Sequence, residues 1–407
     1  MTTPAPLEQH GVELVGYHHL DDRPGFKMGL QRDGDHWYLY LGHLWHRGWS
    51  IVDVTDPRDP RLCRFIPGPE HTWTIQMQVA GGLMVTGLEQ PVSGWGVPDS
   101  LPFEEGAYIW DVARDPEDPV LLGHYRTGGT GTHRNFYAGG DLMYMTANPN
   151  GFAGGMLTVV DISDRANPRE AARWWWPGQH IAGGETPEYG HYLHGPAYVL
   201  GDRAYLGYGR VGMVILDVAD PTSPRLVSRT AFGDLGSSLG CHSAIPLPGR
   251  DLVVANSETI LEGTGDPLNY AFVIDISDEL TPKIISALPA PQPSDGLPYG
   301  NYFEKGGRYG PHNQHHHQGH PDLAEPSDTI VMTYFNAGLR AFDLSDPYRP
   351  REVGYFVPED PRQRLGALPT ALVTQFEDVL VDGRGYVYCT DKNHGLFVLR
   401  LSGTTAR

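Results

Sequence analysis

The sequence of 407 residues predicts an all-β fold, a seven-bladed β-propeller that forms one domain over residues 1–407. A short strand-like motif recurs along the chain, a hairpin pattern precedes its copies, and the last copy lacks the strand that would complete it. Together these observations predict four-stranded units arranged in a closed ring. Two β-sandwiches in tandem are the alternative that the pattern leaves open.

The recurring motif is a run of β-branched and aromatic residues that ends in Asp and is followed by a turn and a Pro, as in "MVILDVADPTSPRLVSR". Successive Asp positions lie 50 to 68 residues apart, which leaves room for four strands and their loops. These positions are Asp53, Asp111, Asp161, Asp217, Asp275 and Asp343. In a seventh copy, "GLFVLRL", Arg400 stands where the Asp is expected.

A hairpin with a turn at Gly or Asp precedes the motif, for example "NFYAGGDLMYMTA" and "AYVLGDRAYLGYG". Each unit therefore has an inner strand, a second strand, the motif strand, and an outer strand after the Pro. Units of this kind are the blades of a propeller.

The chain ends shortly after the seventh motif strand, so blade seven has no outer strand of its own. Residues 11–20, "GVELVGYHHL", match the outer strand of blade six, "REVGYFVP", and we expect them to complete blade seven and close the ring. Two long insertions, at about 90–106 and 288–320, are expected to cover the ring as lids.

Composition narrows the classes of partner. The formal net charge of -19 argues against nucleic acid and against an anionic membrane surface. No run of 18 apolar residues is present, and the first residues lack a signal-peptide pattern. The three cysteines are far apart and contain no CxxC, which favours a reducing, cytoplasmic location.

The stretches "GRYGPHN" and "NAGLRAFDLSDPYRPREVGYFVP", together with the repeated Asp motif, resemble the LVIVD-repeat propeller proteins. The resemblance extends over nearly the whole chain. It implies the propeller fold, and it implies little about activity because that family is largely uncharacterised.

Three histidines stand at the start of the inner strands of blades three, four and five: His133, His194 and His242. They lie 11, 11 and 12 residues ahead of matching positions in the second strands, so we expect them to meet at the axis of the ring. Blade six should add a fourth histidine from the tract "GPHNQHHHQGHPD". We choose His315 as this fourth ligand. The resemblance favours His312 as much as His315, and counting along the chain favours His317 or His320.

Neutral imidazoles that converge from rigid strands suit a transition metal, here Fe or Cu, with Zn or Mn as further candidates. Carboxylates at Glu377, Glu258 and Glu89 are placed to orient the rings. Glu377 and His71 are also the candidates for acid–base catalysis. The architecture resembles carotenoid-cleaving dioxygenases and selenium-binding proteins, without any motif of either. Repeated structural histidines are the alternative explanation.

Other residues are candidates for substrate contacts in the same funnel. The loop "GHLWHRGW" of blade one offers aromatic rings and a cation, with Trp packing between blades as the alternative. Lys27 holds the inner-strand position of blade one, and an exposed lysine is its alternative. The full set is His43, His46, Arg47, Lys27, His312 and His317.

These observations predict a metal-dependent enzyme that acts on a small, aromatic or carboxylated molecule, most readily by oxidation. A metal-dependent hydrolase or lyase is the first alternative. A non-catalytic propeller that binds a protein partner is the second, and a homo-oligomer is compatible with each.

Overall fold

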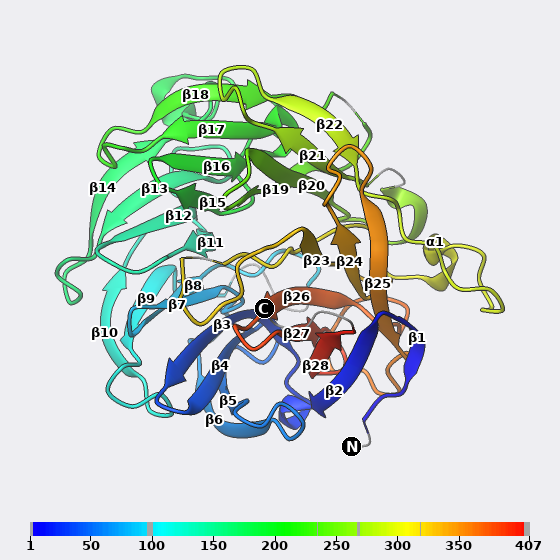
Figure 1. Cartoon of the computed structure of the whole chain (residues 1–407). Helices are drawn as coiled ribbons and strands as arrows, with labels where there is room; N and C mark the ends of the chain where they lie inside the picture. Colours follow the sequence, from blue (N-terminus) through cyan, green and yellow to red (C-terminus); the bar gives the residue numbers. More distant parts are fainter. Residues whose placement is uncertain (1–2, 96–100, 234, 267–268, 318, 403–407) are drawn as a thin grey trace.

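A computed structural model of the chain describes residues 3–95, 101–233, 235–266, 269–317 and 319–402. The strands form seven four-stranded antiparallel sheets, and Figure 1 shows these sheets arranged in a ring. This confirms the predicted seven-bladed propeller. No helix among the described residues is long and apolar enough to cross a bilayer.

Blades one to five each consist of four consecutive strands, which follow one another from the inside of the ring outward. Blade one contains β3 (Gly25–Asp33), β4 (His36–His43), β5 (Gly48–Asp53) and β6 (Arg61–Pro67); blade two contains β7 (Met77–Ala80), β8 (Leu83–Leu88), β9 (Gly106–Asp111) and β10 (Val120–Tyr125); blade three contains β11 (Gly131–Phe136), β12 (Leu142–Asn148), β13 (Met156–Asp161) and β14 (Arg169–Trp174). Blade four contains β15 (Ala197–Leu200), β16 (Arg203–Gly207), β17 (Met213–Asp217) and β18 (Arg225–Thr230); blade five contains β19 (Leu239–Leu247), β20 (Leu252–Glu258), β21 (Ala271–Asp275) and β22 (Lys283–Ala287).

The last two blades are completed by the N-terminus. Blade seven consists of β26 (Phe376–Val381), β27 (Tyr386–Asp391), β28 (Leu396–Leu401) and, on the outside, β2 (Val12–His18). The sheet of blade six consists of β23 (Thr329–Thr333), β24 (Leu339–Asp343), β25 (Arg351–Pro358) and β1 (Pro6–His10). In Figure 1 the blue β2 lies beside the red β28 and the blue β1 beside the orange β25. The predicted closure is therefore confirmed, with β1 as an additional strand that the sequence did not indicate.

The histidine tract forms the innermost edge of blade six. Gln314 bridges to Met332 of β23, and the amides of His312 and His315 donate to the carbonyl oxygens of Thr333 and Val331 at 2.9 and 3.0 Å. This short paired segment replaces a regular inner strand. A four-residue helix, α1 (Tyr302–Lys305), lies in the long insertion that precedes it.

The repeated Asp has a structural role at the end of each motif strand. In blade three the Asp161 carboxylate accepts the amide of Ser163 at 2.8 Å and binds Arg169 at 2.8 Å. Asp343 repeats both contacts, with Ser345 at 2.8 Å and Arg351 at 2.6 Å. The Asp side chain thereby stabilises a turn at which the motif strand ends, and the chain then reverses direction into the outer strand. The repeat is therefore conformational and not catalytic.

Apolar side chains from adjacent blades fill the space between the sheets. One cluster joins blades six and seven and includes Val12, Phe356 and Phe397, and another joins blade seven to blade one and includes Tyr388 and Met28. Because each sheet is covered on both faces by its neighbours, the ring buries its core only when it is closed.

Deletion of residues 1–18 should destabilise the protein by about 5 kcal/mol, since β2 contributes a ladder of backbone hydrogen bonds at roughly 1 kcal/mol each. It should also favour association through the bare edge of β28. Urea unfolding and size-exclusion chromatography would measure both effects. Deletion of residues 1–4, which precede β1, is the control, and equal stability of the two truncated proteins would contradict a closing role for β2.

Candidate metal centre

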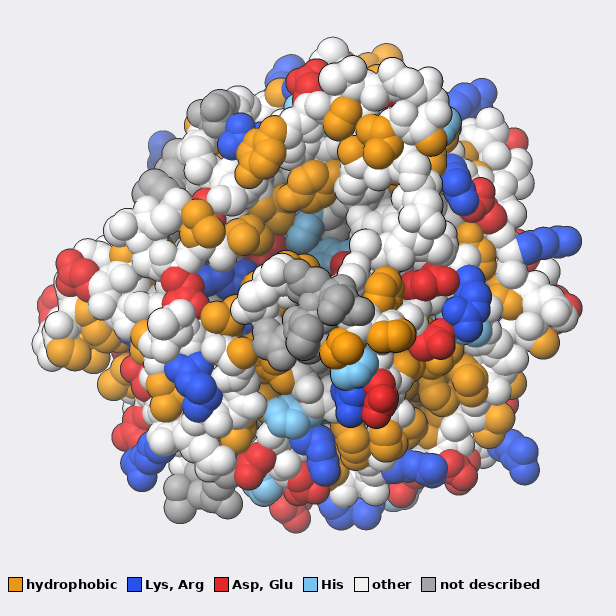
Figure 2. All heavy atoms as spheres, turned by 180° about the vertical axis from the view of Figure 1, so that it is seen from behind, with side chains coloured by type: hydrophobic (Ala, Val, Ile, Leu, Met, Phe, Trp, Pro, Cys, Tyr) orange, Lys and Arg blue, Asp and Glu red, His pale blue; other side chains and the backbone are white. Residues whose placement is uncertain are grey.

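The strands of blades three to six bring four histidines to one place on the axis. His133 lies on β11, His242 lies on β19, and His194 lies in the turn ahead of β15. The fourth is His312, from the tract that edges blade six. Figure 2 shows a hollow near the middle of one face with histidine side chains at its bottom.

A carboxylate stands among these rings. Glu258 Oε2, at the end of β20, lies 3.2 Å from His194 Nε2 and 3.4 Å from His242 Nε2. Its other oxygen, Oε1, lies 3.6 Å from His312 Nε2, and His133 Nε2 lies 3.2 Å from His194 Nε2. The potential ligand atoms of His194, His242 and Glu258 all lie within 4.8 Å of one another. Two imidazoles and a carboxylate at this spacing form a possible metal site.

The outer nitrogens of three of these rings face fixed partners. His133 Nδ1 lies 2.9 Å from Glu89 Oε2 and His242 Nδ1 lies 2.6 Å from Ser243 Oγ, both of which can accept, whereas His312 Nδ1 lies 3.3 Å from the side-chain amide nitrogen of Asn313 and 3.5 Å from Glu377 Oε2. An acceptor at Nδ1 favours the tautomer that carries its proton there, which directs the Nε2 lone pair inward. This is the arrangement that metal-binding histidines have.

Burial keeps the central imidazoles neutral. It lowers the pKa of His194 to about 4, and it holds the pKa of His312 well below its ordinary value. Burial and then the neighbouring Arg134 do the same to the pKa of His242. Neutral rings keep their lone pairs near neutral pH and can bind a metal without first losing a proton.

Three buried cations surround the centre, and two of them pair with its carboxylates. Arg308 lies 2.9 Å from Glu258 Oε1 and 3.6 Å from Glu377 Oε1. Lys392 Nζ lies 2.9 Å from Glu377 Oε1, and burial lowers the pKa of this lysine to about 8. Arg134 donates to His242 Nε2 at 2.6 Å and to Asn313 Oδ1 at 3.0 Å.

The residues present fit a metal, with one adjustment. Glu258 Oε2 is buried and has no well-aligned hydrogen bond among the described residues, so it remains available as a ligand. His194 Nε2 points to the same spot. A metal on His242 would have to displace the hydrogen bond from Arg134, which keeps its second bond to Asn313.

An apolar chamber of about 150 Å³ opens beside the centre. Its walls are mainly aromatic and aliphatic, and Trp73 and Trp95 meet edge to face with ring centroids 5.6 Å apart. The apolar lining residues are Phe26, Leu44, Trp73, Ile75, Val92, Trp95 and Ile260. His133, His194, Glu258 and His312 also line it, so the chamber and the candidate metal site are continuous.

Comparison with known protein families identifies one kind of repeat in the chain. A family model described as the LVIVD repeat matches residues 151–174 and 198–231. These segments contain β13 and β14 of blade three and β15 to β18 of blade four. These two segments of the chain are LVIVD repeats. No curated protein matches it.

The matched repeats belong to the blades that carry His133 and His194 at their inner edges. The matched residues include strands of both blades, but neither His133 nor His194 lies within them. The match therefore explains the scaffold and does not specify the centre.

The structure places three of the four predicted ligands together and replaces the fourth. His133, His194 and His242 meet at the axis, whereas both ring nitrogens of His315 are held by backbone groups, the carbonyl oxygen of Ala324 at 2.7 Å and the amide of Val381 at 3.1 Å. His315 is therefore not available as a ligand in this arrangement. His312, predicted as a substrate contact, takes its place.

Of the two predicted acid–base residues, Glu377 lies beside the centre and His71 does not line the described chamber. Glu377 on β26 is fully buried and touches the His312 ring, and burial raises its pKa despite Lys392 and Arg308. His71 lies in a turn ahead of β7 with a left-handed φ of 51°, and it is absent from the described lining of the chamber.

Two of the six predicted substrate contacts, His43 and Lys27, have structural partners instead. His43 is buried, with its ring nitrogens 3.1 Å from the Pro24 carbonyl oxygen and 2.8 Å from Ser50 Oγ. Lys27 is buried as well and forms a 2.6 Å ion pair with Asp378 of blade seven. In this arrangement it neither contacts a substrate nor lies exposed on the surface, the two possibilities that the sequence left open. His46, Arg47 and His317 are half-buried and lie outside the described chamber lining.

The long insertions supply part of the chamber wall. Val92 and Trp95 come from the first, and Arg308 and His312 come from the second. Residues 96–100 of the first and Gln318 within the tract lie outside the described residues. The sequence did not lead us to predict Arg134 or Arg308. Arg134 directly follows His133 in "THRNF", and Arg308 lies four residues ahead of His312 in "GRYGPHN".

Stability should fall with acid partly through His43. Burial lowers its pKa to about 3, whereas an unfolded histidine titrates near 6.5, so only the unfolded chain gains this proton between these values. This contribution is complete above about pH 6.5 and is lost as the pH falls toward 3. In His43→Gln the free energy of unfolding, measured in urea at pH 7 and 5, should vary less with pH, by up to about 1.4 kcal/mol per unit. The exposed His36→Gln is the control, and an unchanged slope in His43→Gln would contradict the assignment.

Lys27→Ala should destabilise the protein by about 3–5 kcal/mol, because it leaves the Asp378 carboxylate buried without its partner. Denaturant unfolding measures the difference. Lys283→Ala, at the exposed start of β22, should stay within about 0.5 kcal/mol of the parent protein. A Lys27 variant as stable as the parent would restore the interpretation of this lysine as a substrate contact.

Proposed function

We propose that the protein is a metal-dependent enzyme that acts on a small, mainly apolar molecule held in the axial chamber. The observation that carries the proposal is the set of His194, His242 and Glu258, whose ligand atoms cluster at the inner end of that chamber. His133 and His312 flank the set and extend its choice of nitrogen ligands.

The donor set favours iron among the metals considered. Two imidazoles and one carboxylate with an open side form the ligand group of non-haem Fe(II) oxygenases, and the same group also binds Zn in hydrolases. When bound, such a metal would supply activation of oxygen or of water, depending on its identity. The mainly apolar walls support the oxidative alternative, because a substrate that fits them offers little for hydrolysis.

The chain's own residues then have separable tasks. Glu89 and Ser243 orient the imidazoles of His133 and His242 through Nδ1. The indoles of Trp73 and Trp95 hold the substrate and exclude water. Glu377, whose pKa is raised by burial, is the carboxyl group next to the centre that can hold a proton.

A hydrolase or lyase with zinc is the second candidate, and the same donor set favours it. The two differ in the metal found and in the need for oxygen. The alternative of a non-catalytic propeller that binds a protein has less support. The polar groups of the described site point into the chamber, which has room only for a small molecule. Three free thiols, Cys63, Cys241 and Cys389, are in keeping with the proposed cytoplasmic location.

The protein purified without a histidine tag should contain about one firmly bound metal per chain by elemental analysis. His194→Ala should abolish uptake and still fold, because the His194 ring lacks the hydrogen bond to Arg134 that His242 makes. His36→Ala removes an exposed histidine and should leave uptake unchanged. Absence of metal, together with no rise in melting temperature on adding Fe, Cu, Zn or Mn, would refute the proposal.

Glu89→Gln should keep all the metal ligands and still weaken metal affinity by about 10- to 100-fold, since it loses the carboxylate that orients His133. Competition with a chelator of known affinity would measure the change. An affinity equal to that of the parent protein would mean that His133 is not part of the centre.

A further inference from the structure

A second cavity lies away from the axis, between blades four and five. It has a volume of about 310 Å³, twice that of the axial chamber, and the two share none of their described lining residues. Its walls come from the segment ahead of β15, from the turn after β16 and from the residues that follow β18. Cavities of this size commonly hold small molecules.

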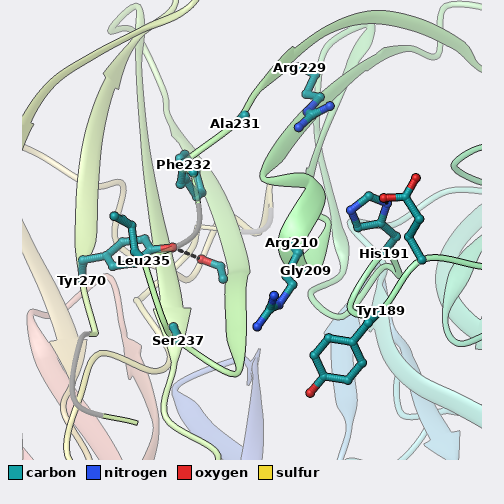
Figure 3. Close-up of a pocket in the computed structure, with 13 residues that line it drawn as sticks. Tyr189, His191, Gly209, Arg210, Arg229, Ala231, Phe232, Leu235, Ser237 and Tyr270 are labelled. Carbon is teal, nitrogen blue, oxygen red and sulfur yellow. Dashed lines mark hydrogen bonds and ion pairs between the residues drawn. The ribbon is translucent and has the colours of Figure 1, made fainter.

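One wall of this interblade pocket is cationic. Figure 3 shows Arg229 and Arg210 on the side of the pocket opposite Phe232, Leu235 and Tyr270. Arg229 donates through Nε to the carbonyl oxygen of Val211 at 2.9 Å, and its guanidinium lies 5.4 Å from the Trp176 ring. These contacts fix the arginine by one edge. Within the described residues Arg229 forms no ion pair, so the terminal nitrogens remain able to bind an anion.

The opposite wall is aromatic. Phe232 and Tyr270 are 8% and 9% exposed, and their rings meet edge to face at 5.9 Å. The Tyr270 hydroxyl is already used, donating to the carbonyl oxygen of Gly240 at 2.7 Å. One face of Tyr270 is stacked on Phe272 with ring centroids 4.5 Å apart, so this wall offers apolar ring surface from Phe232 and from the rest of Tyr270. A planar ring packs well against such a surface.

A further polar atom lies at the pocket without a hydrogen-bond partner. His191 Nδ1 is buried and makes no hydrogen bond among the described residues, with Glu188 Oε2 3.6 Å away. Glu188 is the one carboxylate among the described lining residues, and its side chain is 76% exposed. Water therefore screens the acid more than it screens the histidine.

We propose that the interblade pocket binds a small organic anion, with a carboxylate or phosphate held by Arg229 and a flat apolar body against Phe232 and Tyr270. The cationic and aromatic walls face each other across the cavity, so one ligand can contact both at the same time. The chain carries 49 acidic and 30 basic side chains, which makes a pocket lined by two arginines uncommon on its surface. The proposal does not depend on a metal at the axis.

Calorimetric titration of the full chain with benzoate, phenyl phosphate, acetate and benzyl alcohol tests both walls. Benzoate or phenyl phosphate should bind saturably, and whichever binds more tightly identifies the acid group. Acetate, which lacks the ring, and benzyl alcohol, which lacks the charge, should each bind on the order of tenfold more weakly. Equal binding of all four probes, or no saturable binding of either aromatic anion in the millimolar range, would overturn the proposal.

Variants locate the binding. Arg229→Gln should weaken benzoate or phenyl phosphate on the order of tenfold or more. Arg225→Gln, on the same strand but 70% exposed and 3.6 Å from Asp217, removes the same charge and should leave affinity unchanged. His194→Ala, which alters the axial centre, should also leave it unchanged. Loss of binding in His194→Ala but not in Arg229→Gln would place the anion at the axis and overturn the proposal.

Discussion

The pairing of β2 with β28 is the constraint on which the rest of the structure depends. Each blade presents two apolar faces, and only a closed ring covers both faces of all seven. The N-terminal strands close it across blades six and seven, so residues more than 380 positions apart in the chain lie side by side, as Val12 and Leu401 do. The same closure fixes the inner edges of the blades around one axis. His133, His194, His242 and His312 meet there because they lie at the inner edges of blades three to six.

The polar groups gathered at that axis make sense as a set. Burying neutral imidazoles beside an ionised carboxylate is costly unless each polar atom finds a partner. Arg308 and Lys392 neutralise Glu258 and Glu377, and Glu89 and Ser243 orient two of the rings. Glu258 Oε2 is still left without an aligned partner, and His194 Nε2 faces it. A divalent cation at the proposed site would give Glu258 Oε2 and His194 Nε2 a common partner.

Repetition explains what could be predicted from the sequence. The equal offsets of His133, His194 and His242 from their second strands predicted a common axis, because blades of equal design place equal positions at equal depth. The same argument failed in blade six. There the inner edge is a short irregular segment, and a long connection separates it from β23, so counting back from Val331 pointed to His320 or His317, and the choice of His315 missed His312. Lys27 and His43 were misassigned for another reason: Asp378 and Pro24, which hold them, carry no signal in the local pattern. Asp378 comes from another blade and Pro24 lies 19 residues ahead of His43, so these contacts become visible only in three dimensions.

The net charge of -19 bears differently on the two cavities. A chain so acidic repels anions at long range, which opposes an anion in the interblade pocket. At physiological salt, however, charges more than about 8 Å apart are largely screened, so the groups within that distance decide. At the interblade pocket Arg229, Arg210 and Glu188 are all exposed, and Arg229 forms no ion pair among the described residues. At the axis the carboxylates are buried and paired, and the adjoining chamber is apolar. The fold thus separates a site suited to a cation and an apolar molecule from one suited to an organic anion.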